Sequence, residues 1–235
     1  PLNAAPTIMP VLPRLSALVP CAFALAFATP VHAEDQAELW LNGIVFVPLG
    51  EQNQLIVDTS LRMNEDAKGL SAYVLRGTLL THVAEHVRLG GGYGQFWNYS
   101  DGDFTIAENR PHQDAWIDFP LKAGGAITSR TRLEERLFSS GSNDVGVRLR
   151  QMVQYVGPEL GNTKLKPVLS EEIFYKVNSN DRQTSGFDQA WTTAGLRYPV
   201  TDRFNLDVNY FNQWVFRPGD DKMSHTALVV AGYHF

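Results

Sequence analysis

From residue 39 onward the chain alternates apolar and polar residues in short segments, the period of a β-strand with one face in an apolar medium. The final segment shows this most clearly, because Tyr233, Ala231, Val229 and Ala227 occupy every second position counted back from Phe235. A last strand that ends on an aromatic ring is typical of outer-membrane barrels, which place aromatic side chains at the membrane interface. We therefore expect Tyr233 and Phe235 to belong to a closing strand inserted in a membrane.

The same period predicts an all-β fold, an antiparallel transmembrane β-barrel of 10 to 12 strands. The candidate strands are 39–47, 55–63, 70–80, 86–97, 112–121, 126–138, 145–156, 165–177, 190–199, 204–214 and 224–235. Bacterial barrels with both ends in the periplasm have an even number of strands. Either 39–47 does not span, which leaves ten strands, or one strand is missing from this set, which makes twelve.

The segments between the candidate strands predict the loops. Long polar segments at 98–111 and 178–189 are expected to be outer loops, and 122–125 is expected to be a tight turn. Gly90, Gly91, Gly92 and Gly94 predict a place where the wall bends or where another side chain leans across it.

The polar faces of the strands carry charges at regular spacing. Arg130, Arg132, Glu134 and Arg136 follow one another at every second position, and on a lipid-facing surface each would cost about 2 to 4 kcal/mol near the midplane. They must therefore face a polar interior. Of the neighbours Glu171 and Glu172, we expect Glu172 to point inward. The expected interior charges are Arg62, Arg76, Arg88, Arg130, Arg132, Arg136, Arg148, Arg150 and Arg197, with Asp58, Asp114, Asp118, Glu134, Glu172 and Asp207.

Two interpretations of these charges remain open. Neighbouring strands lie about 4.8 Å apart, so guanidinium and carboxylate groups from adjacent strands can pair and fill a narrow lumen. Alternatively, the excess of arginine forms a basic constriction that passes or binds small anions, because charged rings in a pore select ions by sign.

The beginning of the chain resembles an export signal. An apolar run at 15–28 follows Arg14, and the small-residue pattern Val31-His32-Ala33 comes after it, so residues 1–33 are predicted to be a cleavable signal peptide and 34–235 the barrel. The run is shorter than the roughly 20 residues that a spanning helix needs. Cys21 lies within this run, and Pro20 before it disfavours a lipoprotein signal. Without residues 1–33 the chain has no cysteine and hence no disulfide.

Composition and net charge limit the classes of partner that the protein can bind. The net charge of −5 and the absence of a basic stripe exclude a general nucleic-acid binder. A location in the cell outer membrane implies outer-membrane lipid and the barrel assembly machinery as partners, with small anions as the candidate solutes, and the sequence predicts no cofactor or metal. A soluble periplasmic binding protein is the alternative from another class.

Two enzymatic interpretations are weaker. His82-Val83-Ala84-Glu85-His86 fits the H-x-x-E-H pattern of zinc peptidases, but that chemistry needs a helix, and here the segment lies between two amphipathic strands. A lipid-acting hydrolase at the barrel wall would need a serine with a histidine in reach. Its candidate residues are Ser170, His112 with Asp114, and His225 with Asn212.

Five motifs, taken in their order and spacing, resemble one known family. They are Arg132-Leu133-Glu134-Glu135-Arg136, Gly146-Val147-Arg148-Leu149-Arg150, Ser185-Gly186-Phe187-Asp188-Gln189, Tyr210-Phe211-Asn212-Gln213-Trp214 and the ending 225–235. The chain is similar to a proteobacterial outer-membrane family known as domain of unknown function 2490. The resemblance implies an exported barrel-like protein and supplies no catalytic residues.

Overall fold

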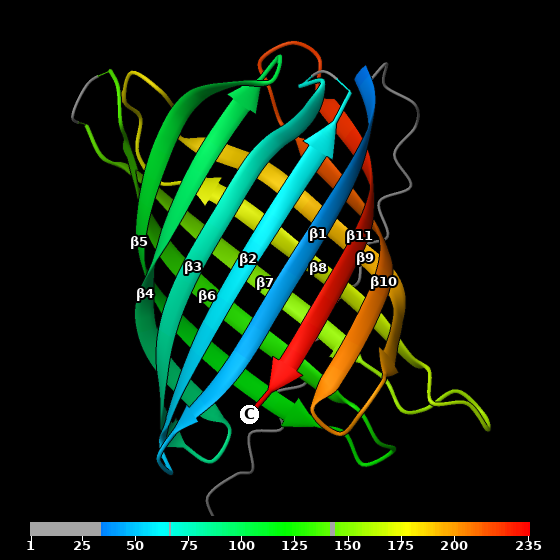
Figure 1. Ribbon diagram of the computed structural model, residues 1–235. Helices are drawn as coiled ribbons and strands as arrows, with labels where there is room; N and C mark the ends of the chain where they lie inside the picture. Colours follow the sequence, from blue (N-terminus) through cyan, green and yellow to red (C-terminus); the bar gives the residue numbers. More distant parts are fainter. Residues whose placement is uncertain (1–33, 66, 142–143) are drawn as a thin grey trace, which may run out of the picture. The chain divides into compact units, whose positions relative to one another are not determined.

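The described part of the chain is a closed β-barrel. The computed structural model describes residues 34–65, 67–141 and 144–235, which form eleven strands (Figure 1). The strands are β1 (Glu34–Leu49), β2 (Asn53–Asn64), β3 (Gly69–Ala84), β4 (Val87–Ser100), β5 (Asp103–Pro120), β6 (Ala126–Phe138), β7 (Gly146–Val156), β8 (Lys166–Lys176), β9 (Gly186–Pro199), β10 (Phe204–Val215) and β11 (Lys222–His234). The predicted all-β barrel is confirmed. The predicted signal peptide, including Cys21, lies outside the described residues.

Among the described residues there is no helix that is long and apolar enough to cross a membrane.

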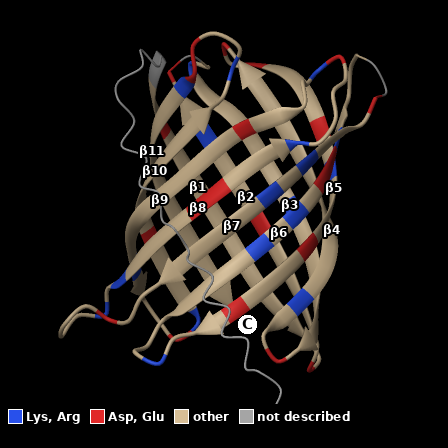
Figure 2. Cartoon of the chain, turned by 180° about the vertical axis from the view of Figure 1, so that it is seen from behind, with Lys and Arg blue, Asp and Glu red and all other residues tan. Residues whose placement is uncertain are grey.

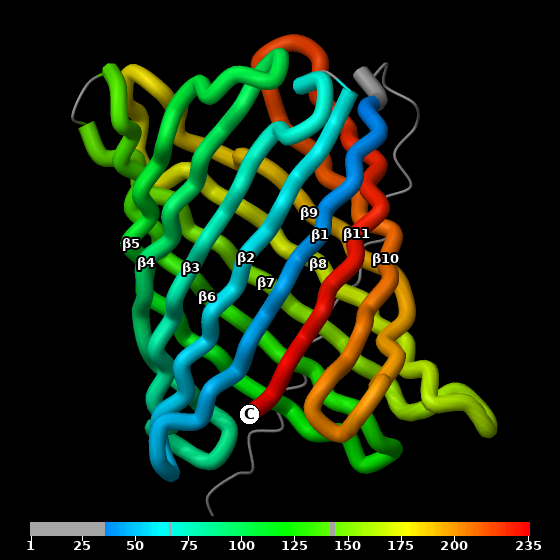
Figure 3. Tube along the Cα trace, in the orientation of Figure 1, coloured from blue at the N-terminus to red at the C-terminus, as the bar shows by residue number. Residues whose placement is uncertain are grey.

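The barrel closes through a parallel pair of strands. Each strand is antiparallel to its neighbour in sequence, but β1 and β11 run in the same direction, with Glu34 opposite Lys222 and Phe46 opposite His234. In Figure 3 the two strands lie side by side. Eleven strands lie within the predicted range of 10 to 12, but the two even-numbered alternatives, ten and twelve, were both wrong. The antiparallel prediction fails at this one pair. Even numbers follow only when the first and last strands run in opposite directions.

The largest difference from the predicted elements is in the first half of the barrel. The segment 98–111, predicted to be a long outer loop, instead continues β4 and starts β5 around the turn at Asp101 and Gly102, both with positive φ. Several polar residues of this segment face the lumen, as Glu108 does. In the sequence such inward-facing polar residues look like those of a solvent-exposed loop. Pro111 is tolerated within β5 because β5 pairs with β6 on either side of it, through Asn109 and His112, while Pro111 itself has no partner there. The second predicted loop is shorter than expected, since β9 begins at Gly186.

The glycines of β4 allow close approach. A Cβ at Gly90 would come within 1.9 Å of the carbonyl oxygen of Leu79, and a Cβ at Gly92 within 2.8 Å of His112 Nε2. His112, on the neighbouring β5, leans over Gly92 and contacts Thr78 on β3, with Nε2 3.0 Å from Thr78 Oγ1. The glycines thus make room for a side chain that reaches over β4.

Candidate functional site: the charged lumen

Strand register brings opposite charges face to face inside the barrel. Asp58 lies directly opposite Arg76 on β3, and Asp114 lies opposite Arg132 on β6. Arg76 holds Asp58 through Nε and Nη2 at 2.9 and 2.7 Å, and Arg132 holds Asp114 through the same two nitrogens at 2.6 Å each. Bidentate pairs of this kind are short and directional. Along β6, Arg132 and Glu134 are each 2% exposed, so these charges are buried within the barrel.

Most of the remaining charges join one connected cluster. Glu134 is its centre: it accepts hydrogen bonds from Arg148 and from Arg150 Nη1 at 3.1 Å, and Arg110 Nη1 lies 3.8 Å away. Glu172 joins Arg130 to Arg150, Glu108 joins Arg110 to Arg136, and Asp188 joins Arg148 to Lys176. Six cations (Arg110, Arg130, Arg136, Arg148, Arg150 and Lys176) therefore share four carboxylates (Glu108, Glu134, Glu172 and Asp188), an excess of two positive charges.

Two further pairs lie nearer the end of the barrel that holds the C-terminus. Arg88 Nη2 contacts Asp118 at 2.7 Å, and Arg197 Nη2 contacts Asp207 at 2.8 Å. The side chains of Asp118 and Arg197 are 33% and 30% exposed, so these pairs are better hydrated than those of the cluster. The contribution of an ion pair to stability falls as its exposure to water rises.

The opposite side of the lumen carries an aromatic cluster among polar side chains. Trp40 of β1, Phe211 of β10 and Leu228 of β11 form a buried cluster, and Trp191 of β9 packs against it with ring centroids 5.5 Å from Trp40. Phe174 of β8 is fully buried and extends the cluster, with its ring 4.5 Å from that of Trp191. In Figure 2, β9, β10 and β11 are mostly tan, which shows that they carry few charged residues, while basic and acidic segments alternate on β6 and β7.

Arg62 lies between the aromatic cluster and the ion pairs of the lumen. Its guanidinium stacks on Trp40, with Cζ 3.8 Å from the ring centroid, and lies 5.7 Å from the ring of Trp191. No carboxylate among the described residues lies within 4.0 Å of it, and its Nε has no hydrogen-bond partner there. Arg62 thus differs from the other predicted lumen arginines, each of which has an ion-pair partner.

The described part of the lumen contains two cavities that share part of their lining. The first, of about 150 Å³, is lined by Arg62 and five other arginines, and the second, of about 130 Å³, by Arg130, Arg132 and Trp116 among others. Both are bordered by Asn42, Asp58 and Arg76. The Asp58–Arg76 pair therefore separates two small spaces along the β1–β3 side of the lumen.

Sequence reasoning missed part of this site. The segments predicted to be loops contain Glu108, Arg110 and Asp188. Lys176 is not among the expected interior charges. The missed signal was the alternation itself, which runs back from His112 through Arg110 and Glu108 without a break. Glu172 faces inward and is 7% exposed, while Glu171 is exposed on the outside.

The structure does not assemble the enzymatic alternatives. Residues 82–84 are the last three of β3, and Glu85-His86 is a turn, so these residues do not form the helix that H-x-x-E-H zinc chemistry requires. Among the described residues no histidine is hydrogen-bonded to Ser170. His112 contacts Thr78 and the carbonyl oxygen of Arg110, and His225 contacts the hydroxyl of Tyr210 on the outer face. No group of three or more potential metal ligands occurs in the described ranges.

The chain is similar in sequence to proteins of unknown function. Residues 37–224 match the model of the family described as "Protein of unknown function (DUF2490)". An uncharacterized protein of Methylorubrum extorquens is 28% identical over 194 residues, which cover 81% of this chain and 82% of the relative. No solved structure matches the chain.

Proposed function

This chain belongs to the DUF2490 family of proteins of unknown function, and we propose that it is an outer-membrane β-barrel whose narrow, arginine-rich lumen passes small anions. The observation that carries this proposal is the division of side chains between the two surfaces of the wall. Buried charges line the inside, while large apolar residues are exposed on the outside along every strand from β1 to β10, among them Leu41, Leu75 and Leu149. A soluble barrel would carry the opposite arrangement.

Aromatic side chains support the proposed membrane location. Tyr73, Trp97, Phe104, Tyr175 and Phe187 lie near the end opposite the C-terminus, and Phe119, Tyr198, Tyr233 and Phe235 lie near the C-terminal end. Aromatic girdles at both interfaces are a feature of outer-membrane barrels. Under this proposal residues 1–33 direct export, and the assembly machinery recognises the closing strand with Tyr233 and Phe235.

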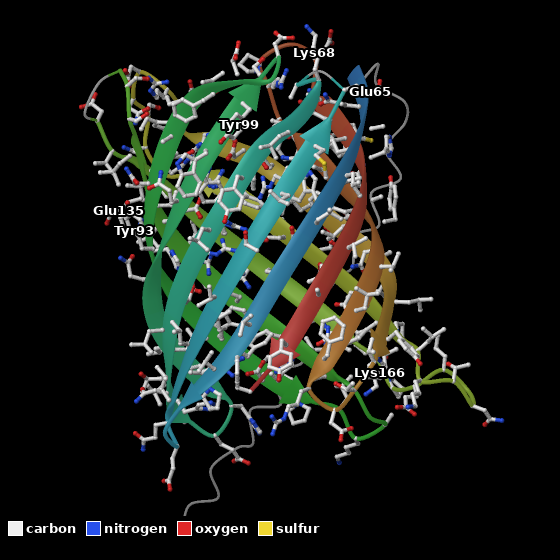
Figure 4. All side chains as sticks on the ribbon, in the orientation of Figure 1. Glu65, Lys68, Tyr93, Tyr99, Glu135 and Lys166 are labelled. Atoms are coloured by element: carbon white, nitrogen blue, oxygen red, sulfur yellow. The ribbon has the colours of Figure 1, made fainter. Side chains whose placement is uncertain are left out.

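The outer surface also carries a few polar residues between these girdles. They bond to one another across strands: Thr131 donates to Gln151 at 2.6 Å, Gln151 donates to Ser129 at 2.9 Å, and Glu171 lies opposite Thr192. Satisfying polar groups internally lowers the cost of exposing them to lipid. Figure 4 shows Glu135 and Tyr93 pointing away from the wall.

Val208→Arg tests the membrane location. Val208 lies within β10 and is 58% exposed on the outside. In lipid an arginine at this depth should lower the free energy of unfolding by about 2–4 kcal/mol. In water the same substitution would change it by less than about 0.5 kcal/mol. The measurement is urea unfolding of the barrel refolded in phospholipid vesicles.

Val83→Arg is the matched control, because Val83 is 56% exposed but lies at the end of β3, next to the turn at Glu85. We expect it to cost about 0–1 kcal/mol, as for a residue at the interface. Equal effects of the two substitutions, or recovery of the protein in the osmotic-shock fraction instead of the outer membrane, would refute the proposed location.

The lumen charges supply the proposed ion preference. Cations exceed carboxylates in the connected cluster, and Arg62 adds an unpaired one. Basic linings favour anions. In planar bilayers the refolded protein should show small, stepwise, anion-preferring currents.

Arg76→Gln should reduce this anion preference, because the substitution leaves the charge of Asp58 uncompensated between the two cavities. The measurement is the reversal potential in a salt gradient. Arg197→Gln is the control, since Arg197 lies near one end and lines neither of these two cavities. An unchanged reversal potential in Arg76→Gln would contradict the proposed path.

A closed wall protein is the second candidate, and the burial of the network favours it. Arg132 and Glu134 are each only 2% exposed, which leaves little room for a continuous channel. A protein that fractionates with the outer membrane, with heat-modifiable gel mobility, but carries no current would be such a wall protein.

A further inference from the structure

We propose that the cavity beside Arg62 is a binding site for a small oxyanion of the phosphate type. The proposal deepens the proposed function, because it names a resting place for an anion within the lumen. It requires only the folded barrel, however, and neither the membrane nor conduction. The cavity of about 150 Å³ is bordered by one carboxylate, Asp58, and by six arginines: Arg62, Arg76, Arg110, Arg136, Arg148 and Arg150.

Arg62 has a charge without an ion-pair partner among the described residues. The other five arginines pair with Asp58, Glu108, Glu134, Glu172 or Asp188. Among the described residues, Arg62 has no carboxylate within 4.0 Å and stacks on an aromatic ring. Its nearest inward carboxylate along β1, Glu38, instead accepts a hydrogen bond from Trp40 Nε1 at 2.6 Å. Arg62 is partly buried, and a charge that is partly removed from water is costly unless a counter-charge accompanies it.

Several polar atoms on the same wall have no hydrogen-bond partner among the described residues. Ser60 is 6% exposed, and its Oγ has no partner, like Arg62 Nε and Asn42 Oδ1. The register places Asn42 opposite Ser60 and Trp40 opposite Arg62, so these groups are neighbours on β1 and β2, and all of them border the cavity. Buried polar groups normally have partners, so one bound group that satisfies several of them explains the arrangement.

The composition of the lining indicates the chemistry of the ligand. Guanidinium groups bind phosphate oxygens through paired N–H donors, and Ser60 adds a hydroxyl donor. Asn42 Oδ1 is an acceptor, so it suits an oxyanion that still carries a proton, as phosphate does at neutral pH. The space, of about 150 Å³, is large enough for a single phosphate group.

The experiment is a calorimetric titration of inorganic phosphate into the full barrel, refolded in a nonionic detergent at low ionic strength. Tryptophan fluorescence provides a second signal, because Trp40 and Trp191 border the cavity. We expect saturable binding of one phosphate per chain. Arg62→Gln should weaken it at least tenfold, and the control Arg197→Gln, which leaves the cavity lining intact, should change it less than twofold.

A folding check, a second variant and two other anions complete the experiment. Heat-modifiable gel mobility verifies that Arg62→Gln folds, and if it does not, Ser60→Ala should still weaken binding several-fold in a folded barrel. Sulfate, which carries no proton at neutral pH, should bind more weakly than phosphate, and equal binding would refute the role of Asn42. An anionic phospholipid in the micelles presents its phosphate from outside the wall and should not compete, so competition would refute a free oxyanion as the ligand.

The experiment can refute the phosphate site and the proposed passage of anions independently of each other. Absence of saturable phosphate binding to the folded protein, or equal binding by wild type and Arg62→Gln, overturns the site even if the barrel conducts anions. Binding that depends on Arg62 in a barrel without current supports the site and refutes only the passage of anions.

Discussion

Glu134→Gln should lower the free energy of unfolding by about 3–5 kcal/mol, the usual effect of removing one partner from a buried ion pair. Glu134 is 2% exposed and is shared by Arg148, Arg150 and Arg110. A neutral amide would leave these three guanidinium groups close together with only Glu108, Glu172 and Asp188 to balance them. The measurement is denaturant unfolding of the refolded barrel, followed by tryptophan fluorescence.

Glu135→Gln is the matched control for this prediction. Glu135 is the next residue on β6, but it lies opposite Val147 on the outer side of the wall and points outward (Figure 4). Neutralising it should change stability by no more than about 0.5 kcal/mol. Equal stability of the two variants would show that Glu134 does not hold the cluster together. The double variant Glu134→Gln with Arg150→Gln should lose less unfolding free energy than the sum of the losses in the two single variants, because the two residues contact each other.

Gly92→Ala should disrupt assembly of the barrel. A Cβ at Gly92 would lie 2.0 Å from the carbonyl oxygen of Gly77 and 2.8 Å from the Cα of Thr78. These are backbone atoms of β3, so no side-chain rotation relieves the overlap and the two strands must separate. We expect a loss of about 3 kcal/mol or more, at or above the upper end of ordinary overpacking. The measurements are refolding yield and heat-modifiable gel mobility.

Gly77→Ala provides the comparison on the facing strand. A Cβ at Gly77 has no atom within 4 Å, so this variant should fold with wild-type yield. Both variants add one methyl group to the wall. At Gly92 it points at the backbone of β3, and at Gly77 it points into open space. If Gly92→Ala refolds as well as Gly77→Ala, then β3 and β4 are not as close as the structure shows.

The strands could be predicted from sequence because their signal is local. In β2, Asp58, Ser60 and Arg62 alternate with Val57, Thr59 and Leu61, and a period of two suffices to assign the residues to opposite faces. The same signal was overlooked at Glu108 and Arg110, where polar residues and Pro111 resembled a loop. A polar lumen makes inward-facing strand residues look like loop residues, so composition alone misleads there.

The lumen aromatic cluster could not be predicted in the same way. Trp40, Trp191 and Phe211 come from β1, β9 and β10, and the distances between them along the chain carry no sign that their rings meet. Their contact depends on strand order and on which side chains reach across the interior. The position of Arg62 beside Trp40 depends on the same long-range arrangement.

The sequence by itself determined the strand-forming segments, the separation of apolar and charged faces, and the family. Only the tertiary structure decided the number of strands, the parallel pairing of β1 with β11, the partner of each arginine and the isolation of Arg62. The physical reason is that alternation is a property of neighbouring residues, whereas register and closure depend on hydrogen bonds between strands far apart in the chain. A shift of one residue in register would exchange the lipid-facing and lumen-facing sides of a strand.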